Sequence, residues 1–273
     1  MKKNPVYPFY DVVIIGGGII GCAVAWFLSK NKEFSGKILV IEKDTTYKKA
    51  ATSLTNSCIR QQFSSEINIR MSQFGASFIN DVNTHFEKSF PLQNRIENFG
   101  YLYLATNAEQ AKQLRANTEL QHLLGVPTKI LLPEKIKQTY PFFKVEDLKL
   151  CSLNKKDEGY FNGYELFQNF RTNAIQNGVE FIENEVISIK TKKKNVDRVT
   201  LLGNLSVASG VYVNCTGTNS KSVAKMIGTV IPVEPRKRYT FVFSAESRLC
   251  SQLPLTIDPA GFHVRSDGNN YMV

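Results

Sequence analysis

The sequence predicts an α/β fold that begins with a parallel β-sheet. Two short apolar runs near the start, rich in β-branched residues, are separated by a glycine-rich turn and a helical segment. Continuous apolar runs of this kind are typical of strands that are buried on both faces of a parallel sheet. The chain has 273 residues, 42% hydrophobic and 21% charged, so it is long enough for one large or two interleaved domains.

The first elements are expected in close succession. Residues 11–15 form a strand that runs directly into the motif Gly-x-Gly-x-x-Gly at residues 16–21. A helix is expected over residues 22–30, and a second strand over residues 37–42 ends in Glu42. This order is typical of the first βαβ unit of a dinucleotide-binding sheet.

Each part of this unit has a chemical role in dinucleotide binding. Gly16 permits the tight turn, Gly18 lets a pyrophosphate approach the backbone, and Gly21 lets the helix pack closely on the strand. The N-terminus of the helix offers free N–H groups and the positive end of its dipole to the anion. Glu42 stands where an acid binds a ribose hydroxyl, and the absence of an adjacent arginine disfavours a ribose 2′-phosphate.

The segment 51–63 bears on whether the dinucleotide is NAD or FAD. It is small and hydroxyl-rich, and it continues into Arg60 and two glutamines. A nicotinamide dehydrogenase would normally continue with an apolar-periodic helix, whereas this composition suits close approach to a polar group. A Ser/Thr-rich surface loop is the alternative interpretation.

The rest of the chain is expected to contain further helices and strands without internal repeats. Helices are predicted over residues 67–86, 107–124 and 164–176, with a short helix starting at Pro133. Strands are predicted over residues 100–105, 178–182, 185–189, 198–202 and 210–217. The last four of these strands form a β-meander that returns the chain to the parallel sheet and ends in a Thr-Gly loop.

One apolar stretch has an alternative interpretation. Residues 12–29 carry no charge and follow Lys2 and Lys3, as in a signal peptide or membrane anchor. Asp11 and the three consecutive glycines argue against that interpretation, so no transmembrane segment is expected.

The net charge of +10, from 34 basic and 24 acidic residues, is compatible with nucleic acid, an acidic membrane, an anionic cofactor or an acidic substrate. Part of the excess lies in residues 190–198, which we interpret as a solvated hairpin tip. Because no aromatic residues are interleaved there, we expect no nucleic-acid partner. The five cysteines and three histidines lack ligand-like spacing, so we expect no metal site, no disulfide framework and a reducing compartment.

Three further segments carry a family resemblance, namely residues 57–64, 159–166 and 232–239. Together with the glycine motif, they resemble the D-amino-acid oxidase/sarcosine oxidase/glycine oxidase family of FAD-dependent amine oxidoreductases. The resemblance implies an α/β fold in which a Rossmann-like FAD-binding domain is interleaved with an α+β substrate domain. It also implies FAD as cofactor and a small amine or N-methyl amino acid as substrate, oxidised at a C–N bond.

The resemblance implies domain boundaries as well. Residues 8–86 and 155–228 would form the FAD-binding domain, and residues 87–154 and 229–273 would form the substrate side. Because the family extends well past the point corresponding to residue 273, we expect a C-terminally truncated chain with an incomplete substrate domain.

The same resemblance implies roles for individual residues. The residues expected to bind FAD are Gly16, Gly18, Ile19, Gly21, Glu42, Lys43, Ser53, Ser57, Val186, Cys215, Thr216 and Gly217. Val186 and Cys215 have a plain core position as their alternative. Arg60 is expected beside the flavin, where a cation stabilises the reduced anion, and a surface ion pair is its alternative. Cys58 and Cys215 are the candidates for covalent flavin attachment, which we do not expect because isolated buried cysteines are mostly inert.

A carboxylate substrate calls for an arginine clamp. Arg236 and Arg238 are predicted to alternate on one face of a strand, where either one binds a carboxylate, a partner or an acidic neighbour. The three segments look most like a mitochondrial branch of the family that is associated with assembly of respiratory complex I. Complex I subunits or assembly factors are therefore candidate partners. A non-catalytic flavin-bound scaffold and an NAD-dependent dehydrogenase stay open as alternative functions.

Overall fold

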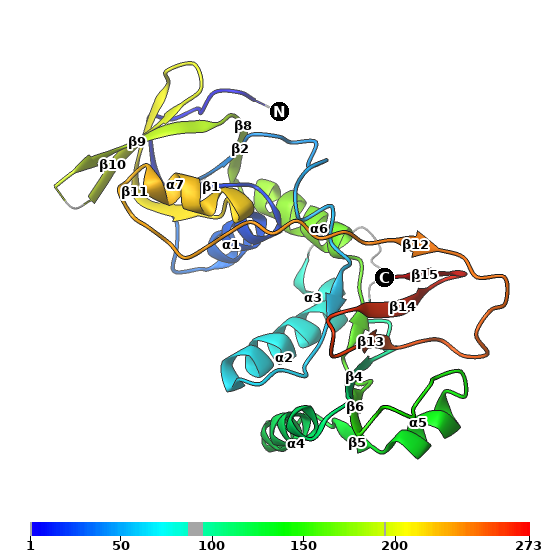
Figure 1. Ribbon diagram of the computed structural model, residues 1–273. Coiled ribbons are helices and arrows are strands. Elements are labelled where there is room, and N and C mark those ends of the chain that lie inside the picture. Colours follow the sequence, from blue (N-terminus) through cyan, green and yellow to red (C-terminus); the bar gives the residue numbers. More distant parts are fainter. Residues whose placement is uncertain (1, 87–94, 194) are drawn as a thin grey trace. The chain divides into compact units, whose positions relative to one another are not determined.

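The computed structural model describes residues 2–86, 95–193 and 195–273, and these form two compact units (Figure 1). Unit 1 contains residues 2–55, 86, 162–193 and 195–237, and unit 2 contains residues 56–85, 95–161 and 238–273. Residues 56–85 thus group with unit 2 rather than with the glycine motif. Lys194 of the predicted hairpin tip, and residues 87–94 next to a predicted domain boundary, lie outside the described residues.

Unit 1 is built on a six-stranded sheet. In spatial order its strands are β8 (Glu180–Glu183), β2 (Ile38–Glu42), β1 (Phe9–Ile15), β11 (Ser206–Asn214), β10 (Asn195–Leu201) and β9 (Val186–Lys192). β1 is parallel to both β2 and β11, and β8 is parallel to β2. The predicted parallel sheet is therefore confirmed. Val13, Ile14, Leu39 and Val40 are fully buried, as expected for its central strands.

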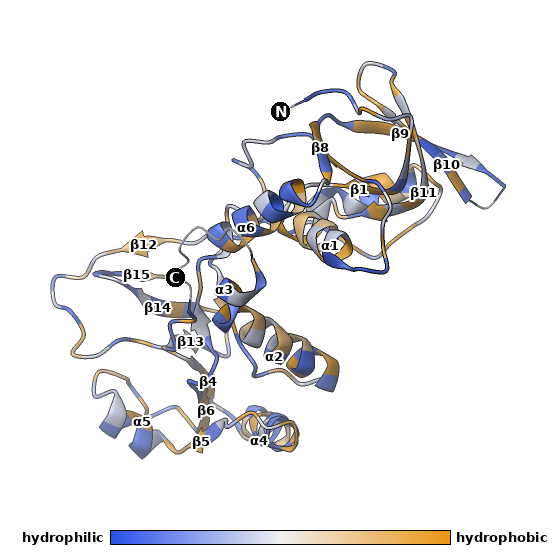
Figure 2. Cartoon of the chain, turned by 180° about the vertical axis from the view of Figure 1, so that it is seen from behind, coloured by the Kyte–Doolittle hydropathy of each residue, from blue (hydrophilic) through white to orange (hydrophobic). Residues whose placement is uncertain are grey.

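The basic hairpin is confirmed, whereas the β-meander is wrong for its first strand, because β8 pairs parallel with β2 at the opposite edge of the sheet. β9 pairs antiparallel with β10, which pairs antiparallel with β11. Lys192 lies opposite Asn195, and Lys193 at the turn has φ +57°. In Figure 2 the β10 side of this hairpin is hydrophilic.

Helices α1 (Ile19–Lys30) and α6 (Gly163–Gln176) pack together in unit 1 through aromatic rings. The Trp26 ring centroid lies 5.5 Å from that of Phe170 and 5.0 Å from that of Phe86. α1 begins three residues earlier than predicted, because Gly18 already serves as its N-cap. A short 3₁₀ turn, η1 (Gly217–Asn219), and α7 (Ser220–Lys225) follow β11.

Unit 2 contains a mixed seven-stranded sheet and a two-stranded ribbon. The sheet order is β12 (Val242–Phe243), β15 (Asn270–Met272), β14 (His263–Asp267), β13 (Leu255–Ile257), β4 (Tyr101–Ala105), β6 (Leu150–Asn154) and β5 (Lys129–Leu131). The ribbon pairs β3 (Cys58–Ile59) with β7 (Gly159–Tyr160). Its helices are α2 (Glu66–Asn80), α3 (Val82–His85), α4 (Ala108–Leu123) and α5 (Pro133–Thr139). The predicted helix 67–86 is therefore two helices, interrupted at Asp81.

The predicted strand around Arg236 and Arg238 is wrong. Residues 229–241, all of them described, have no regular secondary structure. Pro232 and Pro235 have no N–H to donate to a neighbouring strand, which explains why this segment does not join a sheet.

The uncharged stretch 12–29 is divided between β1, the glycine loop and α1. Within the part of the chain that the structure describes, no helix has the length and apolarity needed to cross a membrane.

Candidate functional site

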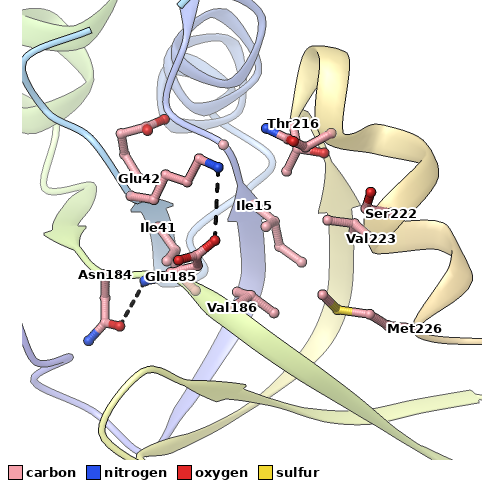
Figure 3. A pocket seen from close by; sticks show the side chains of 13 residues that line it. Ile15, Ile41, Glu42, Asn184, Glu185, Val186, Thr216, Ser222, Val223 and Met226 are labelled. Carbon is pink, nitrogen blue, oxygen red and sulfur yellow. Dashed lines mark hydrogen bonds and ion pairs between the residues drawn. The ribbon is translucent and has the colours of Figure 1, made fainter. Parts of the chain in front are cut away.

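A cavity of about 150 Å³ opens where the parallel strands of unit 1 end (Figure 3). Its walls come from the ends of β1 and β2, the start of β9, and η1 with α7. The lining residues are Ile15, Gly16, Ile41, Glu42, Lys43, Asn184, Glu185, Val186, Thr216, Asn219, Ser222, Val223 and Met226. The carboxyl ends of parallel strands are the usual ligand-binding edge of such a sheet.

The glycine loop is shaped by close backbone contacts. Gly16 has φ +100°, and a Cβ there would lie 2.5 Å from the carbonyl oxygen of Cys215. A Cβ on Gly21 would lie only 1.9 Å from the carbonyl oxygen of Gly16. The conformational roles predicted for these two glycines are confirmed: one makes the turn and the other lets α1 approach β1.

Glu42 holds the loop from the neighbouring strand. Its carboxylate accepts hydrogen bonds from the N–H of Gly17 at 2.8 Å and the N–H of Asp44 at 2.9 Å. Each of its oxygens still has a lone pair for a further donor. The acid is thus placed at the end of β2 and oriented by backbone groups, as a ribose-binding acid has to be.

The N-terminus of α1 meets the hydroxyl-rich segment. The Ile19 N–H donates to the Thr52 hydroxyl at 3.0 Å. The neighbouring Ser53 hydroxyl is buried and has no hydrogen-bond partner. A buried polar atom without a partner is costly, so Ser53 fits a site that is completed by a polar ligand.

A second group without a partner lies under the same loop. The buried Tyr47 hydroxyl is 3.4 Å from the position that a Cβ on Gly17 would occupy, and it has no hydrogen-bond partner. Burial raises the pKa of this phenol, so it stays a donor at neutral pH. Arg171 of α6 lies with its guanidinium carbon 6.0 Å from the Tyr47 ring and adds positive charge.

The remaining predicted residues of unit 1 lie around the cavity or beside it. Lys43 lines the cavity and forms a half-exposed ion pair with Glu185 at 3.9 Å. Val186 is buried and lines the wall. The Cys215 N–H donates to Ile15, and Thr216 bonds to Asn214, so the loop that continues into Gly217 is fixed against the end of β1.

Ser57 and Arg60 lie in unit 2, on either side of β3. Ser57 has φ +48°, and its carbonyl accepts from the Phe161 N–H at 2.9 Å. The guanidinium carbon of Arg60 lies 4.6 Å from the Phe63 ring centroid, and the buried Arg60 Nε has no hydrogen-bond partner. Arg60 lines a cavity of about 400 Å³ with residues of β3 and α2.

Arg236 and Arg238 are both exposed, and Arg236 pairs with Glu234 at 2.9 Å. Burial raises the pKa of the Cys58 and Cys215 thiols. Both are therefore protonated at neutral pH, which disfavours covalent attachment to a cofactor. No group of three or more His, Cys, Asp or Glu side chains with metal-binding geometry occurs in residues 2–86, 95–193 and 195–273.

The family described as "FAD dependent oxidoreductase" (DAO) matches residues 11–273. The chain belongs to this family. Its cofactor is FAD, and the DAO fold accounts for the mixture of α/β and α+β sheets in the two units. The glycine loop, the oriented acid and the unpaired Ser53 hydroxyl are what a dinucleotide requires, so the residues present fit the cofactor.

Individual relatives extend the DAO comparison. FAD-dependent oxidoreductase domain-containing protein 1 of Xenopus laevis is 32% identical, over 96% of this chain and 59% of that protein. Mitochondrial sarcosine dehydrogenase of Mus musculus is 24% identical, over 85% of this chain and 25% of that protein. The structure of L-proline dehydrogenase from P. horikoshii shares the fold, with a TM-score of 0.79 and 24% identity over all of this chain and 70% of that one. The chain thus spans about three fifths of the length of the Xenopus laevis relative.

Three residues of the glycine-loop region were not predicted from the sequence. Thr52 was part of the hydroxyl-rich segment, but spacing alone does not show which hydroxyl caps α1. Tyr47 has φ +55°, a backbone conformation that the sequence pattern does not predict. Arg171 belongs to α6, which is far from the glycine loop in sequence.

Proposed function

We propose that the cavity of unit 1 binds the ADP half of FAD. The observation that carries this proposal is the unpaired, buried hydroxyl of Ser53, the residue after the Thr52 that bonds to the N-terminus of α1, in a chain of the DAO family. Gly16, Gly18, Ile19 and Gly21 would present backbone to the pyrophosphate. Glu42 would accept from a ribose hydroxyl, with the other predicted residues of unit 1, Lys43, Val186, Cys215, Thr216 and Gly217, completing the site. Ser57, which lies in unit 2, stays a separate prediction.

We further propose that the chain is part of an oxidoreductase acting on the C–N bond of a small amine or N-methyl amino acid. Bound FAD would take up a hydride from the carbon next to the substrate nitrogen. Arg60 would place a fixed cation beside the flavin ring, since its Nε has no protein partner. Arg236 or Arg238 would bind a substrate carboxylate, which requires Arg236 to leave Glu234.

The names of the relatives support this substrate class and a mitochondrial location. Sarcosine is an N-methyl amino acid and proline a secondary amine, and both named enzymes are dehydrogenases. The sarcosine enzyme is named as mitochondrial. Both attributes belong to those proteins and are proposals for this chain.

A second candidate function is a flavin-bound scaffold without turnover. The net charge of +10 and the exposed Arg236–Arg238 segment favour it, because they would suit an acidic protein surface. Subunits or assembly factors of respiratory complex I are the partners we propose in that case.

An absorbance spectrum tests the first proposal. Purified protein is incubated with FAD, desalted and scanned, with FAD alone passed through the same column as the control. We expect flavin absorbance to stay with the protein after desalting. A protein that retains no flavin would contradict the proposed cofactor site. Anaerobic addition of N-methyl amino acids then separates the two candidates: bleaching supports the oxidoreductase, and an unchanged flavin spectrum supports the scaffold.

A further inference from the structure

Glu158 is a fully buried carboxylate in unit 2, at the residue before β7. One of its oxygens accepts from the backbone N–H of Gln61 at 2.6 Å and of Gln62 at 2.9 Å. These are the two peptide groups that directly follow Arg60. A buried acid some hundred positions away in sequence therefore fixes the backbone on the C-terminal side of this arginine.

The side chain of Gln62 extends the network into the sheet. Its amide nitrogen donates to the other oxygen of Glu158 at 3.0 Å and to the carbonyl of Tyr101 at 2.8 Å. Its amide oxygen accepts from the Ser152 hydroxyl at 2.8 Å. Because both N–H donors and the oxygen are used, the amide has one orientation, and it anchors the segment to β4 and β6.

Arg60 itself is held without an acidic partner. Its carbonyl accepts from the Ser72 hydroxyl of α2, and its guanidinium stacks on Phe63. Arg60 forms no ion pair with any described residue, and its Nε is buried and unpaired. The position of this cation is therefore set by the surrounding backbone rather than by a salt bridge of its own.

We propose that Glu158 is a positioning residue for Arg60: it fixes the 60–63 segment so that the arginine is held ready for an anion that the protein does not supply. The proposal rests on the proposed function where it identifies that anion as the reduced flavin. A carboxylate suits the task because it only accepts hydrogen bonds. A glutamine at 158 would turn an NH₂ group toward a donor, either the Gln61 and Gln62 amides or the Gln62 side chain.

The cost of burying this acid supports a specific role. Burial raises the pKa of Glu158 to about 7, although hydrogen bonds from Gln62 and Gln61 lower it. Glu158 also disfavours the ionisation of two tyrosines of β4, Tyr101 and Tyr103. An uncharged side chain would make core contacts without this penalty, so packing alone does not explain an acid at this position.

The test is a double-mutant cycle on the FAD-loaded full chain at pH 8, with the midpoint potential of the flavin as readout. Arg60→Ala is expected to lower the two-electron equilibrium constant for reduction about tenfold, or about 30 mV. Glu158→Gln is expected to lower it too, by threefold or more, and to have no further effect in the Arg60→Ala background. Thr256→Val removes a buried hydrogen bond from β13 of the same unit and serves as the control that leaves the potential unchanged.

The sign of the change separates the explanations. If Glu158 acted only through its own charge, its removal would raise the potential, and by the same amount in both backgrounds. That result overturns the proposal. An Arg60→Ala variant with an unchanged potential overturns the flavin contact of Arg60, which belongs to the proposed function.

A readout without flavin tests the positioning step by itself. In protein labelled with ¹⁵N-arginine, the Nε–H signal of Arg60 is assigned by its loss in Arg60→Lys. Glu158→Gln is expected to shift this signal, and Thr256→Val is not. An unmoved signal in a folded Glu158→Gln protein contradicts the proposal whether or not the chain retains FAD.

Discussion

The glycine-loop region of unit 1 and the Arg60 segment of unit 2 are built in opposite ways. The glycine loop is shaped by direct contacts between backbone segments. Gly21, for example, lies against the carbonyl of Gly16, five residues earlier. The Arg60 segment is shaped by hydrogen bonds to buried groups that are distant in sequence, namely the Glu158 carboxylate, the Tyr101 carbonyl and the Ser152 hydroxyl. The glycine loop therefore has almost no room for added atoms. The Arg60 segment instead depends on which of its buried groups donate hydrogen bonds and which accept them.

The sharpest test of this comparison adds one methyl group to the glycine loop. Gly21→Ala is expected to lower the free energy of unfolding of unit 1 by about 3 kcal/mol or more, because its Cβ has no room. Gly75→Ala in α2 is the matched control. Its Cβ would be 3.4 Å from Ile59, and removing a helical glycine stabilises by about 0.5–1 kcal/mol. Urea unfolding measures both, and equal stabilities would contradict the close packing of α1 on β1.

The Arg60 segment is expected to respond to pH. The pKa of Glu158 is raised from 4.5 to about 7 in the folded chain, so folding is favoured when this acid is protonated. Its contribution is present below pH 4.5 and is lost as the pH rises through about 7, on the order of 3 kcal/mol in all. Burial raises the pKa of the neighbouring Tyr101 and Tyr103, so neither phenol titrates in this window.

Urea unfolding of wild type and Glu158→Gln between pH 4.5 and 7.5 measures this effect. The difference in stability between the two proteins should change steadily with pH across this range, because the range lies mainly between the two pKa values of Glu158. A constant difference would show that Glu158 does not titrate in this range.

Two neighbouring hydroxyls separate folding from binding within the glycine-loop region. Thr52→Val removes the acceptor for the Ile19 N–H and is expected to cost about 1 kcal/mol of stability, as for the loss of a helix cap. Ser53→Ala removes a hydroxyl that has no protein partner, so stability should be unchanged while FAD affinity falls roughly fivefold to tenfold. Thermal melts and FAD titrations of both variants show whether the two roles are separate.

The smallest effect is expected outside both regions. Arg236 and Glu234 form an exposed ion pair, so Arg236→Ala should change the free energy of unfolding by less than about 0.5 kcal/mol. Glu234→Ala is its control and should behave alike. A large loss in either variant would show that the segment 229–241 is packed more firmly than its exposure indicates.

The two regions also differ in what the sequence reveals. β1, α1 and β2 were predicted within three residues of their observed bounds, because a buried parallel strand and a glycine turn have local signatures. The β9–β10 hairpin was also predicted, because short β-like runs flank its cluster of lysines. By contrast, β3, β5, β6 and β7 were not predicted, since short strands depend on pairing partners that are far away in sequence.

The residues of the candidate site also differ in how far the sequence predicts them, since local contacts are predictable and distant ones are not. Gly16, Gly21 and Glu42 could be assigned from spacing because their contacts lie within one βαβ unit. Glu158 directly precedes a segment that carried the family resemblance, yet its role depends on hydrogen bonds to positions 61 and 62. Arg236 and Arg238 alternate in sequence, but the neighbouring prolines prevent the strand that would have given this alternation a structural meaning.

The basic hairpin described above has a consequence for self-association. β9 is an edge strand of the six-stranded sheet, and it begins at the cavity with Val186. An open edge offers unpaired N–H and C=O groups to strands of other molecules. Lys190 and Lys192 stand on this edge and Lys193 at its turn, so an identical strand that approached it would bring like charges together. Repulsion between these lysines therefore disfavours pairing of this edge strand with the same strand of a second molecule.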